Sequence, residues 1–382
     1  MKSCTACLLP ETYETLDFNK NGACSVCKGH EFKKKINWNK RKEDLDKLIK
    51  KFRGKSSYDC IIPFSGGKDS TFTLMYLVKE YSIKPLVVRF NHGFYRPLVE
   101  KNNINTFKKL GVDFVDFTPN WKVVKLLMLE TFNRKTDFCW HCHTGIYSYP
   151  IRIAKLYNVP LVIWGETQSE ITSYYNYEDN EIEYEDEAKF NKIRTLGISS
   201  DDMYSILSKS YKGLDKRDFV NYSFPSKKEL DDLNLCSVAL GNFIQWDYAK
   251  NTREIIQKLN WKVGEVEGVP KSINLNGEKM ECFMQGTRDY IKFLKRGYGR
   301  VSQINAFNLR KKTKSIDLAA YENSKYDGRE PHSLKIFLKY MGISKKEFYE
   351  TIKEQVVYPN QMIIKKEKSQ KMSDFKDWYN EN

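Results

Sequence analysis

A six-residue string, Ser-Gly-Gly-Lys-Asp-Ser at 65–70, combines residue types that bind phosphate groups. An apolar run at 60–64 precedes it and a helical pattern of apolar residues at 71–78 follows it. This order predicts a strand, a glycine turn and a helix. Such a turn directs unpaired backbone N–H groups and the positive end of a helix dipole at one point. The string therefore predicts an anion cradle made of Ser65, Gly66, Gly67, Lys68, Asp69 and Ser70.

The string differs from the Walker loop, because Ile62 stands where that loop has a glycine and Asp69 directly follows Lys68. It resembles the pyrophosphate loop (PP-loop) of N-type ATP pyrophosphatases instead. The resemblance implies that ATP binds there and that AMP and pyrophosphate are released. We expect Lys68, Asp69 and Ser70 to act directly in that reaction, with Asp69 helping to hold Mg²⁺. A plain Gly-Gly turn is the alternative, and the full string in its strand-to-helix context favours nucleotide binding.

Two Cys-x-x-Cys pairs open the chain, with sixteen residues between them. Thiolates suit zinc, and two such pairs are typical of a Cys₄ zinc ribbon. Four thiolates leave no open position for water, so we expect a structural Zn²⁺ site rather than a catalytic one. Cysteines buried by chance would explain neither the pairing nor the spacing. The predicted ligands are Cys4, Cys7, Cys24 and Cys27.

Cys139 and Cys142 form a third Cys-x-x-Cys pair. It could form a second zinc site with His141 or His143. It could also hold an iron–sulfur cluster with Cys236 as third ligand, since tRNA thiolases that share the PP-loop carry a Cys-x-x-Cys at the equivalent place. The third option is a structural thiol pair. We favour a structural or substrate-shaping role over the cluster.

Alternating strand and helix patterns predict an α/β fold with a doubly wound parallel sheet. The expected strands are 58–64, 84–90, 112–117 and 161–164, and the expected helices are 70–80, 97–110, 121–132 and 146–157. Ligands bind at the carboxyl ends of such strands. The chain should therefore bring the 65–70 loop together with 91–93 and 165–170. From these we select as nucleotide or metal contacts Asn91, His92, Gly165, Glu166 and Glu170.

Some of these residues also have an alternative role without ligand contact. His92 could equally be a helix cap or a surface residue, and Glu166 and Glu170 could lie in a solvated turn. Two later segments mix aromatic residues with polar or basic ones, which suits an anionic or sugar-bearing ligand. The end of a basic amphipathic helix is the alternative for the second of them. The residues selected there are Trp246, Asp247, Lys295, Tyr298 and Arg300.

The predicted organisation is a zinc ribbon at 1–30, a helical linker at 31–56, a PP-loop domain at 57–310 and a helical C-terminal region at 311–382. The PP-loop domain carries an insertion or lid at about 171–235. The chain has 382 residues and a formal net charge of +15, which indicates an acidic partner such as a nucleotide, a sugar nucleotide or nucleic acid. No apolar run suits a membrane span or a signal peptide, so we expect a cytoplasmic protein without membrane contacts.

The order of these segments resembles the N-acetyl sugar amidotransferases of bacterial surface-glycan synthesis, which act on pseudaminic and legionaminic acid and on O-antigen sugars. The resemblance covers residues 4 to about 310. It implies that an acetamido oxygen attacks the α phosphate of ATP, and that ammonia then displaces AMP to give an acetamidino sugar. The substrate would be an acetamido sugar, free or as its sugar nucleotide. The implied cofactors are Mg²⁺ and Zn²⁺.

The source of the ammonia is a separate question. Lys2 follows Met1, so an N-terminal cysteine glutaminase is not expected, and none of the nine cysteines lies in a Gly-x-Cys-x-Gly elbow. We therefore expect a separate glutaminase subunit (HisH-like, alone or with a HisF-like ammonia-channel subunit), as the resemblance also implies. Two rival hypotheses remain. One is a PP-loop tRNA thiolase, although we do not favour a nucleic-acid partner, and the other is a zinc-ribbon nucleotide-binding scaffold without catalysis.

Overall fold

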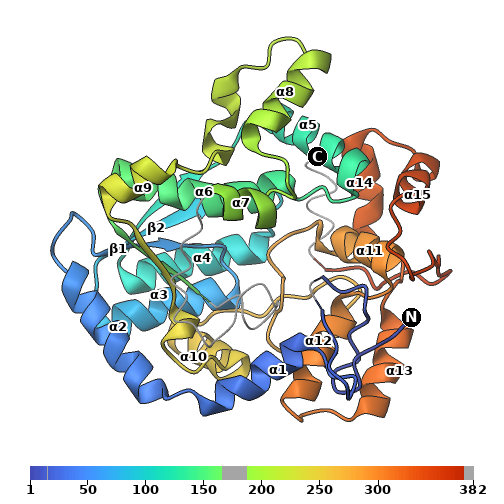
Figure 1. The fold of residues 1–382 in the computed structure, drawn as a ribbon, viewed down its shortest axis with the longest axis horizontal. Helices are drawn as coiled ribbons and strands as arrows, with labels where there is room; N and C mark the ends of the chain where they lie inside the picture. Colours follow the sequence, from blue (N-terminus) through green and yellow to red (C-terminus); the bar gives the residue numbers. More distant parts are fainter. Residues whose placement is uncertain (15, 166–186, 374–382) are drawn as a thin grey trace. The chain divides into compact units, whose positions relative to one another are not determined.

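The computed structural model describes residues 1–14, 16–165 and 187–373 (Figure 1). The chain forms two compact units. One comprises Asn37–Thr167 and Asn180–Lys262, and contains the sheet. The other comprises Met1–Ile36 and Val263–Asn382, together with a short piece from the middle of the chain. Within the described ranges, no helix is both long and apolar enough for a bilayer crossing.

The sheet unit is built on five strands in the order β3-β2-β1-β4-β5, and every neighbouring pair runs parallel. Parallel strands require crossover connections, and helices supply most of them here. The predicted α/β class with an all-parallel sheet is thus confirmed. The strands are β1 (Cys60–Pro63), β2 (Pro85–Phe90), β3 (Asp113–Phe117), β4 (Leu161–Trp164) and β5 (Cys236–Ala239).

Helices cover both faces of this sheet. On one face α6 packs on β1, β2 and β4, and α5 and α9 pack on α6. Side chains alternate across a strand, so Ile61 and Val88 face α6 whereas Ile62 and Val87 point to the other side, where α3 packs with α4 and α10. The α-helices of this unit are α2 (Trp38–Phe52), α3 (Lys68–Tyr81), α4 (Pro97–Leu110), α5 (Trp121–Lys135), α6 (Trp140–Leu156), α7 (Glu187–Ile193), α8 (Ser200–Ser210), α9 (Lys227–Leu233) and α10 (Tyr248–Leu259), with 3₁₀ helices η3 (Lys216–Tyr222) and η4 (Leu240–Asn242).

Helix α6 contacts the sheet closely because it carries a glycine at the point of contact. A Cβ atom on Gly145 would lie 2.2 Å from Cζ of Phe90, whose buried ring belongs to β2. Replacing Gly145 by alanine should therefore lower the free energy of unfolding by about 1–3 kcal/mol, although alanine is the better helix former. Urea denaturation would measure this. Gly29→Ala in α1 is the control, because nothing lies within 4 Å of its added Cβ, and a destabilisation equal to that of Gly145→Ala would contradict the argument.

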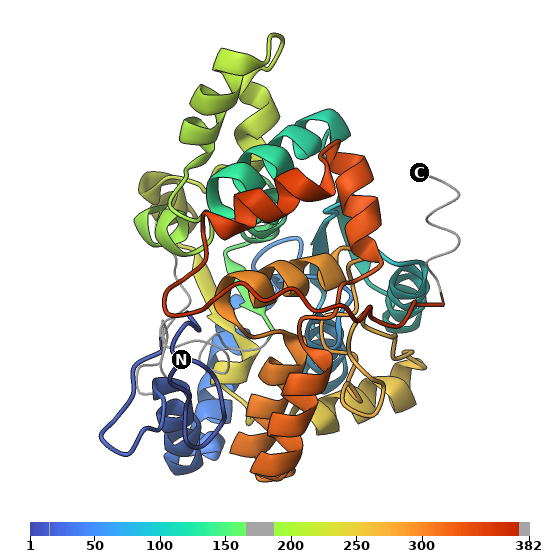
Figure 2. The same cartoon turned by 90° about the vertical axis from the view of Figure 1, so that its right-hand side faces the viewer.

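The second unit is helical apart from the cysteine-bearing segment, residues 263–284 and the C-terminal stretch. Helices α12 and α13 lie side by side, and α14 and α15 pack on α11 (Figure 2). After α15 the chain continues to residue 373 without helix or extended strand. The helices are α1 (Ser25–Phe32), η1 (Lys33–Lys35), α11 (Gln285–Arg296), α12 (Arg300–Arg310), α13 (Ile316–Tyr326), α14 (Ser333–Met341) and α15 (Lys345–Lys353).

Candidate functional site

The 65–70 loop joins β1 to α3 and gathers its backbone N–H groups. The N–H groups of Ser65 and Gly66 both donate to Oγ of Ser70 at 3.2 Å, and that of Gly67 lies 3.4 Å from Oγ of Ser65. Gly66 adopts φ +81°, a conformation that glycine tolerates best, and Gly67 is the N-cap of α3. Successive N–H groups at a helix N-terminus form a concave site for anions. The loop has the geometry of a phosphate cradle.

Lys68 and Asp69 begin α3 beside this cradle. Nζ of Lys68 lies 2.5 Å from Oδ2 of Asp69 and 4.4 Å from the ring centroid of Tyr248, the first residue of α10. The Lys68 side chain is 4% exposed, whereas that of Asp69 is 19% exposed. The ring and the carboxylate thus hold the ammonium group at the loop. A partly exposed carboxylate is a hard oxygen ligand of the kind that Mg²⁺ prefers.

Gly165 brings the end of β4 against the first turns of α3. A Cβ atom there would lie 3.2 Å from Oγ1 of Thr73 and 3.4 Å from the backbone carbon of Asp69. The carbonyl of Gly165 accepts from the N–H of Gly241 at 3.1 Å, which links β4 to η4. The structure therefore brings Gly165 to the 65–70 loop, as predicted. The two other residues selected from this segment, Glu166 and Glu170, lie outside the described residues.

Asn91 and His92 follow β2 at the same carboxyl edge of the sheet. Oδ1 of Asn91 accepts from the N–H of Gly93 at 2.9 Å. The His92 ring is buried, with Nδ1 accepting from the N–H of Phe94 at 3.2 Å and with the ring of Tyr95 stacked 4.1 Å away. The surface alternative for His92 is wrong, because neighbouring aromatic rings cover it. His92 is a core histidine at the edge where the nucleotide contacts are expected.

His141, in the first turn of α6, is the second buried histidine of this region. Its Nε2 lies 3.3 Å from the carbonyl oxygen of His92. Burial lowers the pKa of His92 to about 3 and that of His141 to about 4, so both imidazoles are neutral at pH 7. The pair therefore connects β2 to α6 by packing and hydrogen bonding, and not by charge.

The neutral histidines predict a pH dependence of stability. In the unfolded chain both should titrate near 6.5, so between that pH and their lowered pKa values the unfolded state binds more protons. The contribution of the two histidines to the free energy of unfolding is fully present above about pH 6.5. It is lost as the pH falls, by up to about 1.4 kcal/mol per pH unit for each histidine. His92→Gln should reduce this slope between pH 7 and pH 5 in urea denaturation. An unchanged slope in His92→Gln would contradict the assignment.

Trp246 and Asp247 belong to the sheet unit and support α10. Trp246 is buried, and its ring meets that of Phe72 in α3 edge to face at 5.4 Å. Oδ1 of Asp247, the N-cap of α10, accepts from the N–H of Lys250 at 3.0 Å. Trp246 thus packs the start of α10 against α3 and Asp247 caps the helix, which places Tyr248 over Lys68. Sequence reasoning overlooked Tyr248, although it directly follows Asp247.

Lys295, Tyr298 and Arg300 lie in the other unit, at the junction of α11 and α12. Arg300 is buried and forms a forked ion pair with Asp289, with nitrogen–oxygen distances of 3.1 and 2.9 Å. Tyr298 is buried with its ring 5.0 Å from that of Tyr13. The carbonyl of Lys295 accepts from the N–H of Val357 at 2.9 Å. Asp289 thus balances the charge of Arg300, and the substrate-binding role of the three residues stays a prediction.

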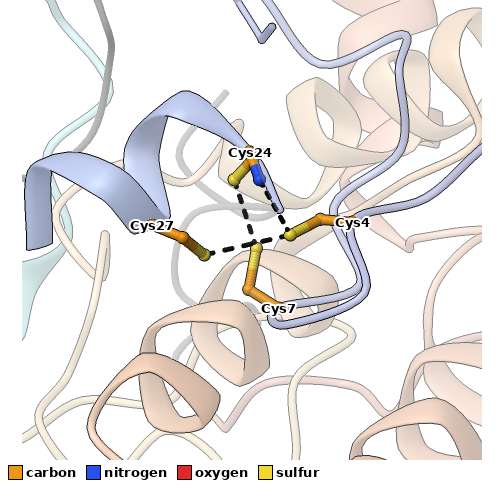
Figure 3. A group of neighbouring side chains, drawn as sticks. All are labelled: Cys4, Cys7, Cys24 and Cys27. Carbon is orange, nitrogen blue, oxygen red and sulfur yellow. Dashed lines mark hydrogen bonds between the residues drawn. The ribbon is translucent and has the colours of Figure 1, made fainter. Parts of the chain in front are cut away.

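The four N-terminal cysteines form a candidate metal centre (Figure 3). Their Sγ atoms lie within 4.8 Å of one another, with Cys4 3.9 Å from Cys27 and Cys7 3.7 Å from Cys24. The N–H of Cys24 also donates to Sγ of Cys4 at 3.3 Å, as N–H groups do to metal-bound thiolates. All four side chains are buried. Four converging sulfurs fit a tetrahedral Zn²⁺ ion, as the spacing predicted.

The other cysteines do not form such a centre. Cys139 is the N-cap of α6 and Cys142 lies in its first turn, beside His141 and thus at the carboxyl edge of the sheet. Cys236 instead pairs in register with Leu161, the first residue of β4, at the opposite edge. The suggestion that Cys236 completes a cluster with Cys139 and Cys142 is therefore wrong. In the described ranges, only the four N-terminal cysteines form a group of three or more potential metal ligands.

Comparisons with known proteins add little to this geometry. No protein-family model matches the chain. One curated relative, an uncharacterized protein of Methanocaldococcus jannaschii, is 28% identical over 132 residues. The match covers 34% of this chain and 46% of that protein, so the chain spans about half the length of the relative. The fold and the four cysteines define the class of this protein. It is an α/β protein with an all-parallel sheet and a four-cysteine centre.

Proposed function

We propose that the protein is an ATP-dependent amidotransferase that converts an acetamido group of a sugar into an acetamidino group. The observation that carries the proposal is the set of N–H groups at 65–67 that converge at the N-terminus of α3, with Lys68 and Asp69 beside them. This arrangement suits the β and γ phosphates of a nucleotide. The choice of acceptor rests on the order of sequence segments that resembles the N-acetyl sugar amidotransferases.

The reaction requires the protein to position the reactants and to neutralise phosphate charge, and it requires no nucleophile from the protein. The acetamido oxygen attacks the α phosphorus of ATP, the bond to pyrophosphate breaks, and an O-adenylyl imidate forms. Ammonia then adds to the imidate carbon and AMP leaves. The loop N–H groups and Lys68 would stabilise the departing pyrophosphate. A Mg²⁺ ion held with the help of Asp69 would neutralise further phosphate charge when bound.

A separate glutaminase subunit is the proposed source of ammonia. None of the nine cysteines lies on a Gly-x-Cys-x-Gly elbow, which is the setting of a triad glutaminase. Four of the nine form the N-terminal centre, and Cys60 is fully buried in β1, where burial raises the pKa of its thiol. Release of glutamate from glutamine by the purified chain alone would contradict this part of the proposal.

The test is one incubation of the purified chain with Mg-ATP, an ammonium salt and a panel of free and nucleotide-linked diacetamido sugars. Mass spectrometry should find a sugar in which NH replaces oxygen, with a matching amount of AMP. Lys68→Gln should lose both products, whereas Lys47→Gln, a mostly exposed lysine of α2, should keep them. AMP release that is stimulated by tRNA without any change in the sugars would indicate a tRNA thiolase instead. Unchanged activity in Lys68→Gln would remove Lys68 from the mechanism, and ATP binding by wild type without any AMP or altered sugar would favour the scaffold.

A further inference from the structure

The helical unit contains a cavity of about 380 Å³ that none of the roles described above uses. Three segments distant in sequence line it: the loop at 265–272 that precedes α11, the end of α13 with the turn after it, and the C-terminal stretch at 369–372. Its volume falls within the usual range of about 300–1,000 Å³ for small-molecule sites. The cavity therefore has room for a ligand of nucleotide size.

The lining is strongly basic. Lys271, Arg329 and Lys371 line the cavity, together with one acidic residue, Glu265. Nζ of Lys271 lies 2.6 Å from Oε1 of Glu265, so this pair is neutral overall. Neither Arg329 nor Lys371 has a carboxylate partner among the described residues. Two positive charges are therefore left on the wall, and their chemistry favours a ligand with at least two negative charges.

An aromatic surface accompanies one of these charges. The guanidinium of Arg329 lies 5.1 Å from the ring centroid of Tyr326, and its Nε donates to the carbonyl of Lys325 at 2.9 Å. The hydrogen bond and the ring fix the side chain and leave its terminal nitrogens for an anion. Nζ of Lys325 also lies 5.4 Å from the same ring centroid, so a base or sugar would contact the part of the ring that these two cations leave uncovered.

The wall formed by the C-terminal stretch is held in place by several hydrogen bonds. The N–H of Ser369 donates to the carbonyl of Glu330 at 3.0 Å, and Nε2 of His332 lies 3.1 Å from the carbonyl oxygen of Ser369. The hydroxyl of Ser369 also lies 3.4 Å from Oε1 of the buried Glu267. The loop at 265–272 is itself closed by a bridge between Val266 and Val269. The cavity is therefore formed before any ligand arrives, which reduces the entropic cost of binding.

We propose that this cavity binds a nucleoside diphosphate, free or as the carrier part of a sugar nucleotide. The diphosphate would pair with Arg329 and Lys371, and the base or sugar would lie against Tyr326. This inference goes beyond the proposed function and does not depend on it, because it concerns a second anion site with its own residues. Residues of the 65–70 loop can be substituted without changing any residue that lines the cavity.

Isothermal titration calorimetry tests the proposal, with UDP, UDP-N-acetylglucosamine, uridine and inorganic phosphate as probes. UDP should bind wild-type protein, and the double variant Arg329→Gln/Lys371→Gln should bind it at least about 10-fold more weakly, because two charged hydrogen-bond donors are lost. The control Arg217→Gln/Lys346→Gln changes net charge equally at exposed positions and should leave the affinity unchanged. Lys68→Gln should also keep UDP binding, which separates this cavity from the ATP loop.

The affinities of the other probes identify the ligand. Tighter binding of UDP-N-acetylglucosamine than of UDP would identify a sugar nucleotide, whereas equal affinities would identify the free nucleotide. Inorganic phosphate that binds as tightly as UDP would overturn the assignment of a nucleoside. Equal UDP affinity in wild type and in Arg329→Gln/Lys371→Gln, with both proteins shown to be folded by circular dichroism, would overturn the site. Failure of wild type to bind UDP at millimolar concentration would do the same.

Discussion

Alanine in place of Gly66 should reduce ATP-dependent AMP formation by about 10²–10³-fold, the loss expected when one preorganised donor group is misplaced. An added Cβ would lie 2.3 Å from the side-chain amide of Asn103 and 2.8 Å from Cγ1 of Val99, so the loop or these buried α4 side chains must shift. The backbone also has φ +81°, which disfavours any side chain. Both effects displace the N–H groups that now meet at Ser70. Nucleotide affinity and AMP release measure the result.

The chain offers a matched control for the backbone effect alone. Gly111, after α4, has φ +63° with nothing within 4 Å of its added Cβ. Gly111→Ala should therefore cost about 1 kcal/mol of stability without changing AMP formation. Equal losses of activity in the two variants would show that crowding at the loop does not matter. Full activity in Gly66→Ala would remove the cradle from the mechanism.

Serine in place of Cys7 should abolish stoichiometric zinc binding and destabilise the N-terminal segment. Cys7 is fully buried, and a hydroxyl there would replace one of four converging sulfurs by a poor zinc ligand. Binding free energies of structural Zn²⁺ reach about 10–16 kcal/mol in small domains, so the loss should exceed that from any single core side chain. Metal analysis and differential scanning calorimetry would show both effects.

The control for the metal centre is Cys282→Ser in the same unit. Sγ of Cys282 accepts from the N–H of Met284 at 3.3 Å, a contact that a serine hydroxyl can replace. This variant should keep one zinc ion per chain and should melt close to wild type. Zinc retained at full stoichiometry in Cys7→Ser would show that the four cysteines are not a single site.

Local signals predicted several parts of the fold to the residue. Helix α4 begins and ends as expected, because Pro97 suits the first helical position and Gly111 supplies the left-handed cap. The Cys-x-x-Cys pairs predicted the four-sulfur centre, since each pair already places two thiols side by side. The glycine-rich string predicted the turn into α3 for the same reason. For α4 and the turn into α3, the determining contacts lie within a few residues along the chain, whereas the centre joins two pairs whose Sγ contacts span 17 and 23 residues.

Tertiary contacts decided the parts that the sequence did not reveal. Helix α6 begins at Trp140, six residues before the expected start, because the side chains of its first turns pack into the core of the sheet unit. Strand β5 is as short as β4, and it was missed because its pairing with β4 joins segments separated by more than 70 residues. The same pairing places Cys236 at the edge of the sheet opposite Cys139. The spacing of cysteines along the chain does not show at which edge of the sheet each one lies.

The roles of single polar residues were equally hard to predict. Asp247 and Arg300 have the chemistry of ligand contacts, and the structure uses them as a helix cap and as half of a buried ion pair. Lys68 and Tyr248, by contrast, are brought together by the packing of α10 on α3. Side-chain chemistry therefore limits what a residue can do, and only the partners brought by the fold decide which option is used.

The helical unit is assembled from the two ends of the chain, and this affects its synthesis. The four cysteines pack with Tyr298, Ala306, Leu309 and Ala319 in one apolar cluster. At about 5–20 residues per second, a ribosome needs roughly 15–60 s to reach those residues after it has made the cysteines. During that interval the zinc-binding segment is outside the ribosome without its apolar cover. Metal capture or a chaperone should therefore protect the nascent thiols, and ribosomes stalled near codon 280 should display a segment that a thiol reagent modifies unless zinc is present.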